Sequence, residues 1–145
     1  MTVQVFVALT VAWAVLEGAL SPRQRSGSWH ATLSGSTLLL VTVAGLVVGE
    51  GALVGAVPLV LGIGLRLAAI RTLGDRFTHA LELLPGHRLE DEGLYRWMRH
   101  PSEVGLLLIG LGTGLLLGVV WLVPLMLVPM GVRIRAEERL LAAEL

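Results

Sequence analysis

The residues best suited to chemistry lie in two polar stretches, each of which borders an apolar segment. The first stretch comprises Tyr95, Arg96, Arg99, His100, Pro101 and Glu103. Proline suits the first turn of a helix, where its missing N–H would be unpaired anyway, so Arg99 and His100 are predicted to lie just before a helix N-terminus. Such a terminus favours anions, and arginine adds a planar pair of donors for a carboxylate or phosphate. The alternative is a basic cluster that contacts lipid headgroups.

The second stretch contains acidic and basic residues near the end of the sequence: Arg133, Arg135, Glu137, Glu138 and Arg139. In a helix, Arg133 and Glu137 share a face because they are four residues apart. Glu137 and Glu138 are adjacent and therefore point about 100° apart, so one of them is predicted to face inward. The alternative is a solvated helix end held by surface ion pairs.

A glycine-rich apolar segment connects the two polar stretches and holds Gly105, Gly110, Gly112, Gly114 and Gly118. Small residues let neighbouring helices approach closely. Gly110 could instead let a flat ring of a bound ligand approach the backbone. Both interpretations, packing and ligand contact, are open at this point.

Several classes of function are excluded or disfavoured. The sequence has no cysteine, which excludes thiolate metal sites and a cysteine nucleophile. It contains no zinc signature, phosphate-binding loop or nucleophile elbow, and no metal is expected. Its basic residues are interleaved with acidic ones and its formal net charge is zero, so binding to nucleic acid is not expected.

The composition indicates how these residues are positioned. Of the 145 residues, 54% are hydrophobic and 15% are charged, whereas soluble domains are usually about 45–50% apolar. Membrane-spanning helices need about 20 mostly apolar residues. Three such segments are 3–20, 29–49 and 52–70, and the apolar stretch 102–130 is long enough for a hairpin that turns near Gly118. The predicted fold is all-α: a membrane bundle of about five transmembrane helices whose last two form a tight hairpin.

The arginines predict the orientation of this bundle. With five spans, ten of the 11 basic residues fall on one side, and the remaining one, Arg66, lies near the end of the third span, where it is expected to snorkel. By the positive-inside tendency, that side is cytoplasmic. Residues 1–70 are thus three spans with the N-terminus outside, and 71–101 form a cytoplasmic loop that carries the site motif. Residues 102–145 are the hairpin and a cytoplasmic amphipathic helix, and a bacterial or archaeal cytoplasmic membrane is the expected location.

Three segments carry a family resemblance. They read R-T-L-G-D-R-F over 71–77, G-L-Y-R-W-M-R-H-P over 93–101 and R-I-R-A-E-E-R-L over 133–140. In this order and spacing they resemble the isoprenylcysteine carboxyl methyltransferase family and its phospholipid methyltransferase relatives. The pattern of that family is R-x-L-G-x-x-F, then G-L-Y-R-x-x-R-H-P-x-Y, an apolar hairpin and R-I-x-x-E-E-x-x-L. The resemblance covers roughly residues 66–141.

The resemblance implies an integral membrane enzyme that binds S-adenosylmethionine, methylates a lipophilic acceptor arriving from the bilayer at the cytoplasmic face, and releases S-adenosylhomocysteine. Carried over by position, the implied catalytic residues are Arg133 and Glu137. The implied cofactor-binding residues are Tyr95, Arg99, His100, Pro101, Glu103, Gly110, Glu137 and Glu138. The expected partners are the lipid bilayer and the acceptor, and self-association is left open.

The sequence departs from the family pattern at two places. Glu103 stands where the pattern has tyrosine, and an acid there would alter the cofactor contact or the acceptor preference. The family's usual F-G-x-x-Y segment does not follow the Glu137-Glu138 pair. Two other functions are considered: an NADPH-dependent membrane reductase of related fold and a non-catalytic helical membrane subunit.

Overall fold

The computed structural model describes residues 1–20, 29–74 and 93–144, and this part of the chain is helical without a strand. The α-helices are α1 (Thr2–Leu20), α2 (Trp29–Val48), α3 (Ala56–Leu73), α4 (Pro101–Leu117) and α5 (Leu127–Glu144). Three short 3-10 helices are η1 (Leu53–Gly55), η3 (Gly93–Arg96) and η4 (Val120–Met126). The predicted all-α class is confirmed, and helices occupy each predicted apolar segment.

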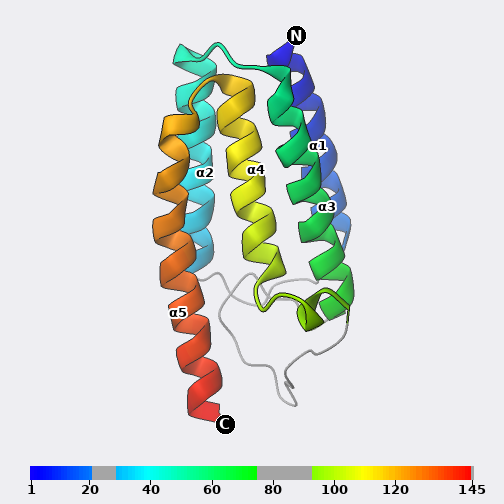
Figure 1. Ribbon diagram of the computed structural model, residues 1–145, viewed down its shortest axis with the longest axis vertical. Coiled ribbons are helices and arrows are strands. Elements are labelled where there is room, and N and C mark those ends of the chain that lie inside the picture. The colour runs from blue at the N-terminus through cyan, green and yellow to red at the C-terminus, as the bar shows by residue number, and fades with distance from the viewer. Residues whose placement is uncertain (21–28, 75–92, 145) are drawn as a thin grey trace.

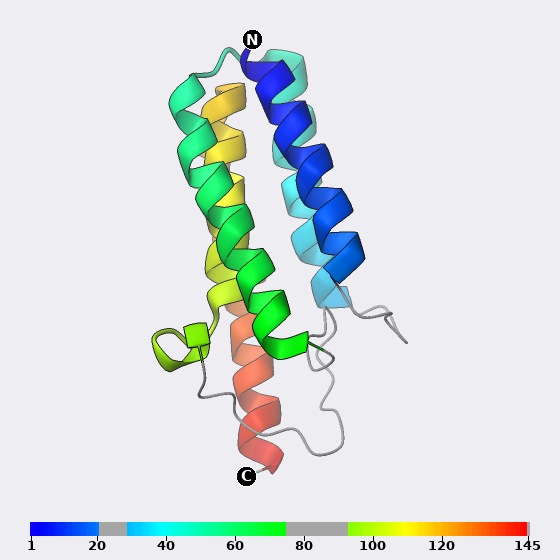
Figure 2. The ribbon, with the colours of Figure 1, turned by 90° about the vertical axis from the view of Figure 1, so that its right-hand side faces the viewer.

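The helices form a bundle in which α4 is central and packs against α3 along its length and against α2, α1 and η4 (Figure 1). The view from the side shows α3 and α4 next to each other, with η3 near the end where α4 begins (Figure 2). At this same end α5 extends beyond the other helices. The two polar stretches of the sequence therefore meet at one end of the bundle.

Glycines allow α3 and α4 to approach with their backbones in contact. A Cβ atom added to Gly62 of α3 would lie 2.6 Å from the carbonyl oxygen of Gly105 in α4. A Cβ atom added to Gly112 would lie 2.5 Å from the backbone nitrogen of Leu59. No side chain fits at either position, so the glycines set the spacing of these two helices. The packing interpretation holds for Gly105 and Gly112.

The hairpin turns where the sequence predicts. Helix α4 ends at Leu117, and Gly118 has a φ of 74°, the left-handed conformation that glycine adopts without strain. The chain then forms η4, which contains Pro124, before α5 begins at Leu127. Pro129 falls in the first turn of α5, where proline is tolerated. A 3-10 segment that contains a proline thus separates the turn from α5.

By length and composition, one described helical stretch, Leu53–Leu73, is long and apolar enough to cross a membrane. Three shorter apolar stretches are Thr2–Glu17, Gly35–Val47 and Pro101–Leu117. The 17 residues of α4 extend about 26 Å at 1.5 Å per residue, which is less than the roughly 30 Å of a hydrocarbon core. The five helices are present, but the prediction of five transmembrane spans is not confirmed.

The buried interior divides into an apolar part and a charged part. The apolar core consists of Phe6, Val41, Leu59, Ile109, Leu116, Leu117 and Val119. Among the described residues, the buried charged side chains are Arg66, Glu103 and Arg133. Glu103 lies in the first turn of α4, and Arg66 lies in the second half of α3. The charged part is therefore at the end of the bundle where the polar stretches meet.

Candidate functional site

The start of α4 has the form predicted from the sequence. Pro101 is the first helical residue and is buried, and His100 is the N-cap. The carbonyl oxygen of His100 accepts a hydrogen bond from the N–H of Val104 at 3.1 Å. The His100 side chain is largely buried and Arg99 is exposed. The sequence thus places an imidazole at the inner side of this helix start and a guanidinium at its surface.

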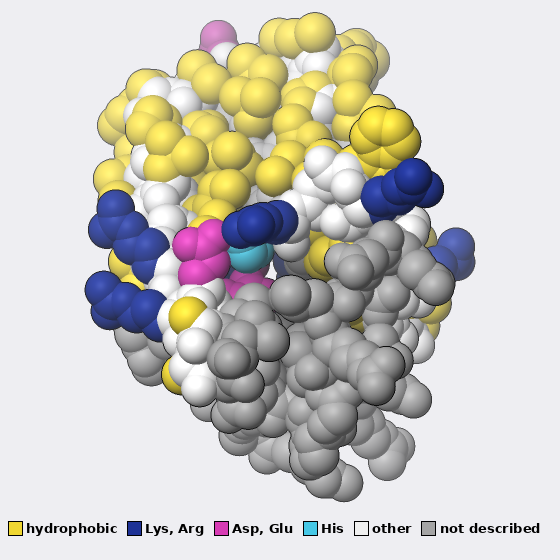
Figure 3. Space-filling view, turned by 60° about the horizontal axis from the view of Figure 1, so that its bottom comes forward, with side chains coloured by type: hydrophobic (Ala, Val, Ile, Leu, Met, Phe, Trp, Pro, Cys, Tyr) yellow, Lys and Arg dark blue, Asp and Glu magenta, His cyan; other side chains and the backbone are white. Residues whose placement is uncertain are grey.

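Two carboxylates from α5 approach the imidazole of His100. Its Nδ1 lies 3.4 Å from Oε2 of Glu137, and its Nε2 lies 3.7 Å from Oε1 of Glu138. The two glutamate side chains are 42% and 51% exposed, so the prediction that one of them faces inward is wrong. Both instead face His100. Figure 3 shows acidic side chains around a histidine at this end of the molecule, next to the hydrophobic surface of the helices.

The carboxylates change the acid–base properties of His100, which lies before α4 and outside its apolar segment. The hydrogen bond to Glu137 raises the pKa of His100 above its ordinary value of 6.5, and the negative charges of Glu137 and Glu138 add to this effect. Burial acts in the opposite direction but is outweighed. The positively charged form of the imidazole is therefore favoured in this site.

A second ion pair, between Glu103 and Arg133, lies one helical turn deeper in the bundle. The Nε atom of Arg133 is 2.9 Å from Oε1 of Glu103, and the two side chains are 10% and 5% exposed. The other carboxylate oxygen of Glu103, Oε2, is buried and accepts no hydrogen bond from the described residues. Both residues were predicted from the sequence as site residues, but their contact with each other was not predicted.

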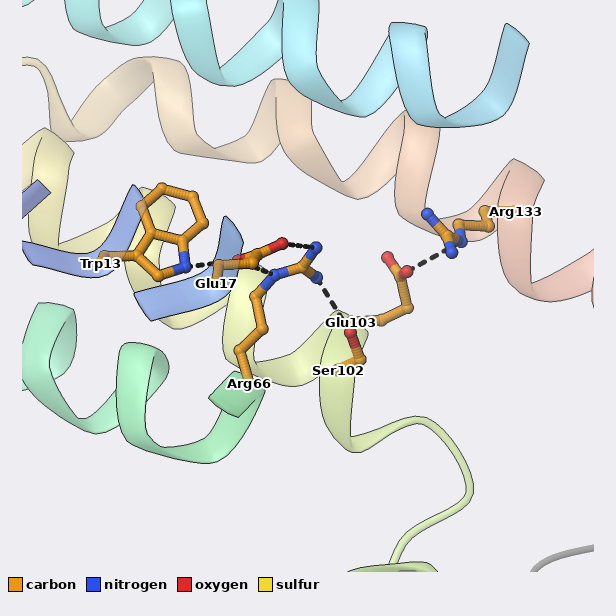
Figure 4. A network of polar contacts seen from close by, with 6 residues as sticks. All are labelled: Trp13, Glu17, Arg66, Ser102, Glu103 and Arg133. Carbon is orange, nitrogen blue, oxygen red and sulfur yellow. Dashed lines mark hydrogen bonds and ion pairs between the residues drawn. The ribbon is translucent and has the colours of Figure 1, made fainter. Parts of the chain in front are cut away.

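A third group of polar residues joins α1, α3 and α4 (Figure 4). Nε and Nη2 of Arg66 lie 2.8 and 2.7 Å from the two carboxylate oxygens of Glu17, and Nη1 donates to Oγ of Ser102 at 2.9 Å. The indole N–H of Trp13 also donates to Glu17. The prediction that Arg66 snorkels is wrong, because Glu17 gives it a partner inside the bundle. A signal was available: each is the sole charged residue of its apolar segment, and such residues are rarely without function or partner.

The remaining predicted site residues are Tyr95 and Gly110. Tyr95 lies half-buried in η3. Gly110 is buried, and Met126 of η4 fills the space where its side chain would be; a contact between Gly110 and a cofactor stays a prediction. Residues 75–77 of the first motif and most of the 71–101 loop lie outside the described residues. Among the described residues, no group of three His, Asp or Glu side chains could hold a metal ion.

Comparison with known proteins finds a matching family and similar proteins. Residues 53–143, more than half of the chain, match the model of the isoprenylcysteine carboxyl methyltransferase (ICMT) family. The chain is 42% identical over 65 residues to protein-S-isoprenylcysteine O-methyltransferase B of Arabidopsis thaliana, a match that covers 43% of this chain and 33% of that protein. It is 40% identical over 65 residues to the human protein-S-isoprenylcysteine O-methyltransferase, covering 43% of this chain and 23% of the human protein.

The match covers a third or less of the length of these curated relatives. They come from a plant and an animal, so the predicted bacterial or archaeal source is not borne out. No solved structure matches the chain significantly. The family match contains all three sequence motifs, η3, and the His100–Glu137 and Glu103–Arg133 contacts. The chain therefore belongs to the isoprenylcysteine carboxyl methyltransferase family.

Proposed function

We propose that the protein uses S-adenosylmethionine to methylate a lipophilic or amphiphilic acceptor at the cytoplasmic face of a membrane. The observation that carries this proposal is the convergence of two motifs on one site. His100 belongs to one motif, and Glu137 and Glu138 belong to the other. The imidazole of His100, at the start of α4, lies 3.4 Å from the carboxylate of Glu137 and 3.7 Å from that of Glu138, both in α5. This convergence lies inside the part of the chain that matches the family.

The chemistry of these side chains fits the cofactor. S-adenosylmethionine carries a positively charged amino group, a sulfonium, a carboxylate and ribose hydroxyls. The partly exposed oxygens of Glu137 and Glu138 can accept from its donors, and the exposed guanidinium of Arg99 can bind its carboxylate. The Nε2 atom of His100 is buried and makes no hydrogen bond to the described residues, so a ligand atom would satisfy it.

When bound, the cofactor supplies an activated methyl group on its sulfonium. The task of the protein residues is then to bind, orient and exclude water, because an in-line displacement depends mainly on positioning. His100, Glu137 and Glu138 would hold the polar part of the cofactor. Arg133, one turn along α5 from Glu137, would lie on the acceptor side and hold Glu103 in place.

The outer surface of the bundle supports a membrane location. Along α1, the side chains of Val3, Val7, Val11 and Val15 are exposed on one face, and soluble proteins rarely expose continuous apolar surface of this kind. Hydrophobic side chains cover much of the helix surface in Figure 3. The exposed arginines of the described residues include Arg71, Arg96, Arg99, Arg135 and Arg139. All five lie at the end that carries the site, which supports a cytoplasmic orientation of the site.

The two other functions considered have less support. A membrane reductase would bind NADPH at this end of the bundle, and a structural subunit would bind no cofactor there. The family match favours neither alternative, and the paired carboxylates beside His100 suit a cationic ligand better than the phosphates of NADPH.

Label transfer tests the proposed activity. The protein would be reconstituted in lipid nanodiscs and incubated with S-adenosylmethionine labelled in its methyl group and with extracted membrane lipids. We expect label in the lipid fraction, and its loss in the His100→Ala variant. Glu50→Gln serves as the control, since Glu50 is exposed in the turn between α2 and η1, away from the site. NADPH binding together with no label transfer would overturn the proposal.

A further inference from the structure

One carboxylate oxygen of Glu103 accepts no hydrogen bond from the part of the chain that the structure describes. Oε1 of Glu103 is held by Arg133 at 2.9 Å, but Oε2 is buried and accepts no hydrogen bond from the described residues. The side chain is 5% exposed, so water in bulk does not reach it. Buried carboxylate oxygens are normally satisfied, and leaving one unpaired is unfavourable. A donor on a bound molecule would satisfy it.

The place of Glu103 relative to His100 suggests which molecule this is. Glu103 follows His100 by three residues on α4, and Arg133 precedes Glu137 by four residues on α5. Both spacings correspond to about one helical turn, so the Glu103–Arg133 pair forms the next layer inward from the proposed cofactor site. A lipophilic acceptor that enters the bundle and approaches the cofactor would meet this layer with its polar head group.

The charges of the pair determine which head groups suit Glu103. Arg133 balances the charge of Glu103 through Oε1, and an ionised carboxylate can only accept hydrogen bonds. A hydroxyl or amine on the acceptor can donate to Oε2. A carboxylate on the acceptor has no proton to donate and would bring a second negative oxygen against Oε2, which is repulsive in a buried site.

We infer that Glu103 selects the methyl acceptor, by accepting a hydrogen bond from a hydroxyl or amine head group and disfavouring a carboxylate. This inference rests on the proposed function and narrows its methyl acceptor to a hydroxyl or an amine. Such an acceptor differs from the carboxyl group that the family description names. The reaction breaks the O–H or N–H bond of the acceptor and forms a bond from that oxygen or nitrogen to the methyl carbon. The sulfonium of S-adenosylmethionine becomes a neutral thioether, and Oε2 of Glu103 takes the released proton.

Three probes of equal chain length test the inference: 1-dodecanol, dodecylamine and dodecanoate. Each would be titrated calorimetrically into the protein in phosphatidylcholine nanodiscs, with empty nanodiscs as the baseline for partitioning. We expect dodecanol and dodecylamine to bind about tenfold or more tightly than dodecanoate, as one lost or repulsive hydrogen-bond contact predicts. Glu103→Gln should remove this preference, because an amide can donate to dodecanoate, whereas Glu50→Gln should leave it unchanged.

Equal affinity of the wild-type protein for all three probes, or an unchanged preference in Glu103→Gln, would overturn the inference. If Glu103→Gln does not fold because Arg133 loses its partner, the double variant Glu103→Gln/Arg133→Gln removes both charges and gives the same prediction. Binding of S-adenosylhomocysteine is measured on the same samples. Its absence would count against the proposed function, while the head-group preference alone decides the role of Glu103.

Discussion

Arg66 of α3 and Glu17 of α1 form a two-point ion pair inside the bundle, with Nε and Nη2 at 2.8 and 2.7 Å from the two oxygens of one carboxylate. The side chains are 6% and 14% exposed. Ser102 connects this pair to the first turn of α4, directly beside Glu103. The pair therefore fixes α1 against α3 and also borders the interior layer that contains Glu103 and Arg133 (Figure 4).

Removing one partner of this pair should destabilise the protein strongly. In Arg66→Gln the carboxylate of Glu17 stays buried without a cation, which typically costs about 3–5 kcal/mol. The double variant Glu17→Gln/Arg66→Gln leaves no uncompensated charge and should recover most of that loss. The apparent melting temperature in detergent measures both effects, with Arg139→Gln as an exposed control. A double variant no more stable than Arg66→Gln would contradict the account of a paired, buried ion pair.

The raised pKa of His100 predicts a pH-dependent contribution to stability. The unfolded chain has the ordinary value of 6.5, and the folded value is higher because of Glu137 and Glu138. The stabilisation is therefore fully present below pH 6.5 and is lost as the pH rises through the folded value. This stabilisation should therefore be measurable at pH 5.5, which lies below the unfolded pKa of the imidazole.

The measurement compares the melting temperatures of the wild-type protein and His100→Gln from pH 5.5 to pH 9. We expect the wild-type advantage to be largest at the acidic end of this range and to shrink toward alkaline pH. A difference in melting temperature that stays constant across this pH range would show that Glu137 and Glu138 do not stabilise the positively charged form of the imidazole.

The close approach of α3 and α4 predicts opposite effects for two matched glycine substitutions. In Gly112→Ala the new methyl group would lie 2.5 Å from the backbone of Leu59, and such overpacking typically costs about 1–3 kcal/mol. Gly64→Ala, also inside a helix, meets no atom within 4 Å and should be neutral or stabilising by about 0.4–1 kcal/mol. Thermal unfolding of the two variants tests this, and equal melting temperatures would contradict the proposed packing.

Local features of the sequence were sufficient to predict much of this fold. The apolar segments gave the helices, Pro101 gave the start of α4, and Gly118 gave the turn of the hairpin. The resemblance also grouped His100 with Glu137 and Glu138, because each lies in a motif with fixed spacing to its helix. These predictions needed only neighbouring residues or a known pattern.

Pairings between distant parts of the chain were not predictable in the same way. Arg66 and Glu17 are 49 residues apart, and their pairing depends on how α1 packs against α3. The contact between Glu103 and Arg133 likewise depends on the facing sides of α4 and α5. The number of spans stays a prediction, because hydropathy alone does not show where a helix ends; α4 has 17 residues.

The most direct test of the central claim is the equilibrium binding of S-adenosylhomocysteine to the purified protein in nanodiscs, measured by calorimetry. We expect saturable binding that is weakened about tenfold or more in Glu137→Gln and His100→Ala, as loss of a charge-assisted hydrogen bond of about 1.5–3 kcal/mol predicts. Glu50→Gln should bind like the wild-type protein. No binding, or equal binding in all four proteins, would contradict the assignment of His100 and Glu137 to a cofactor site.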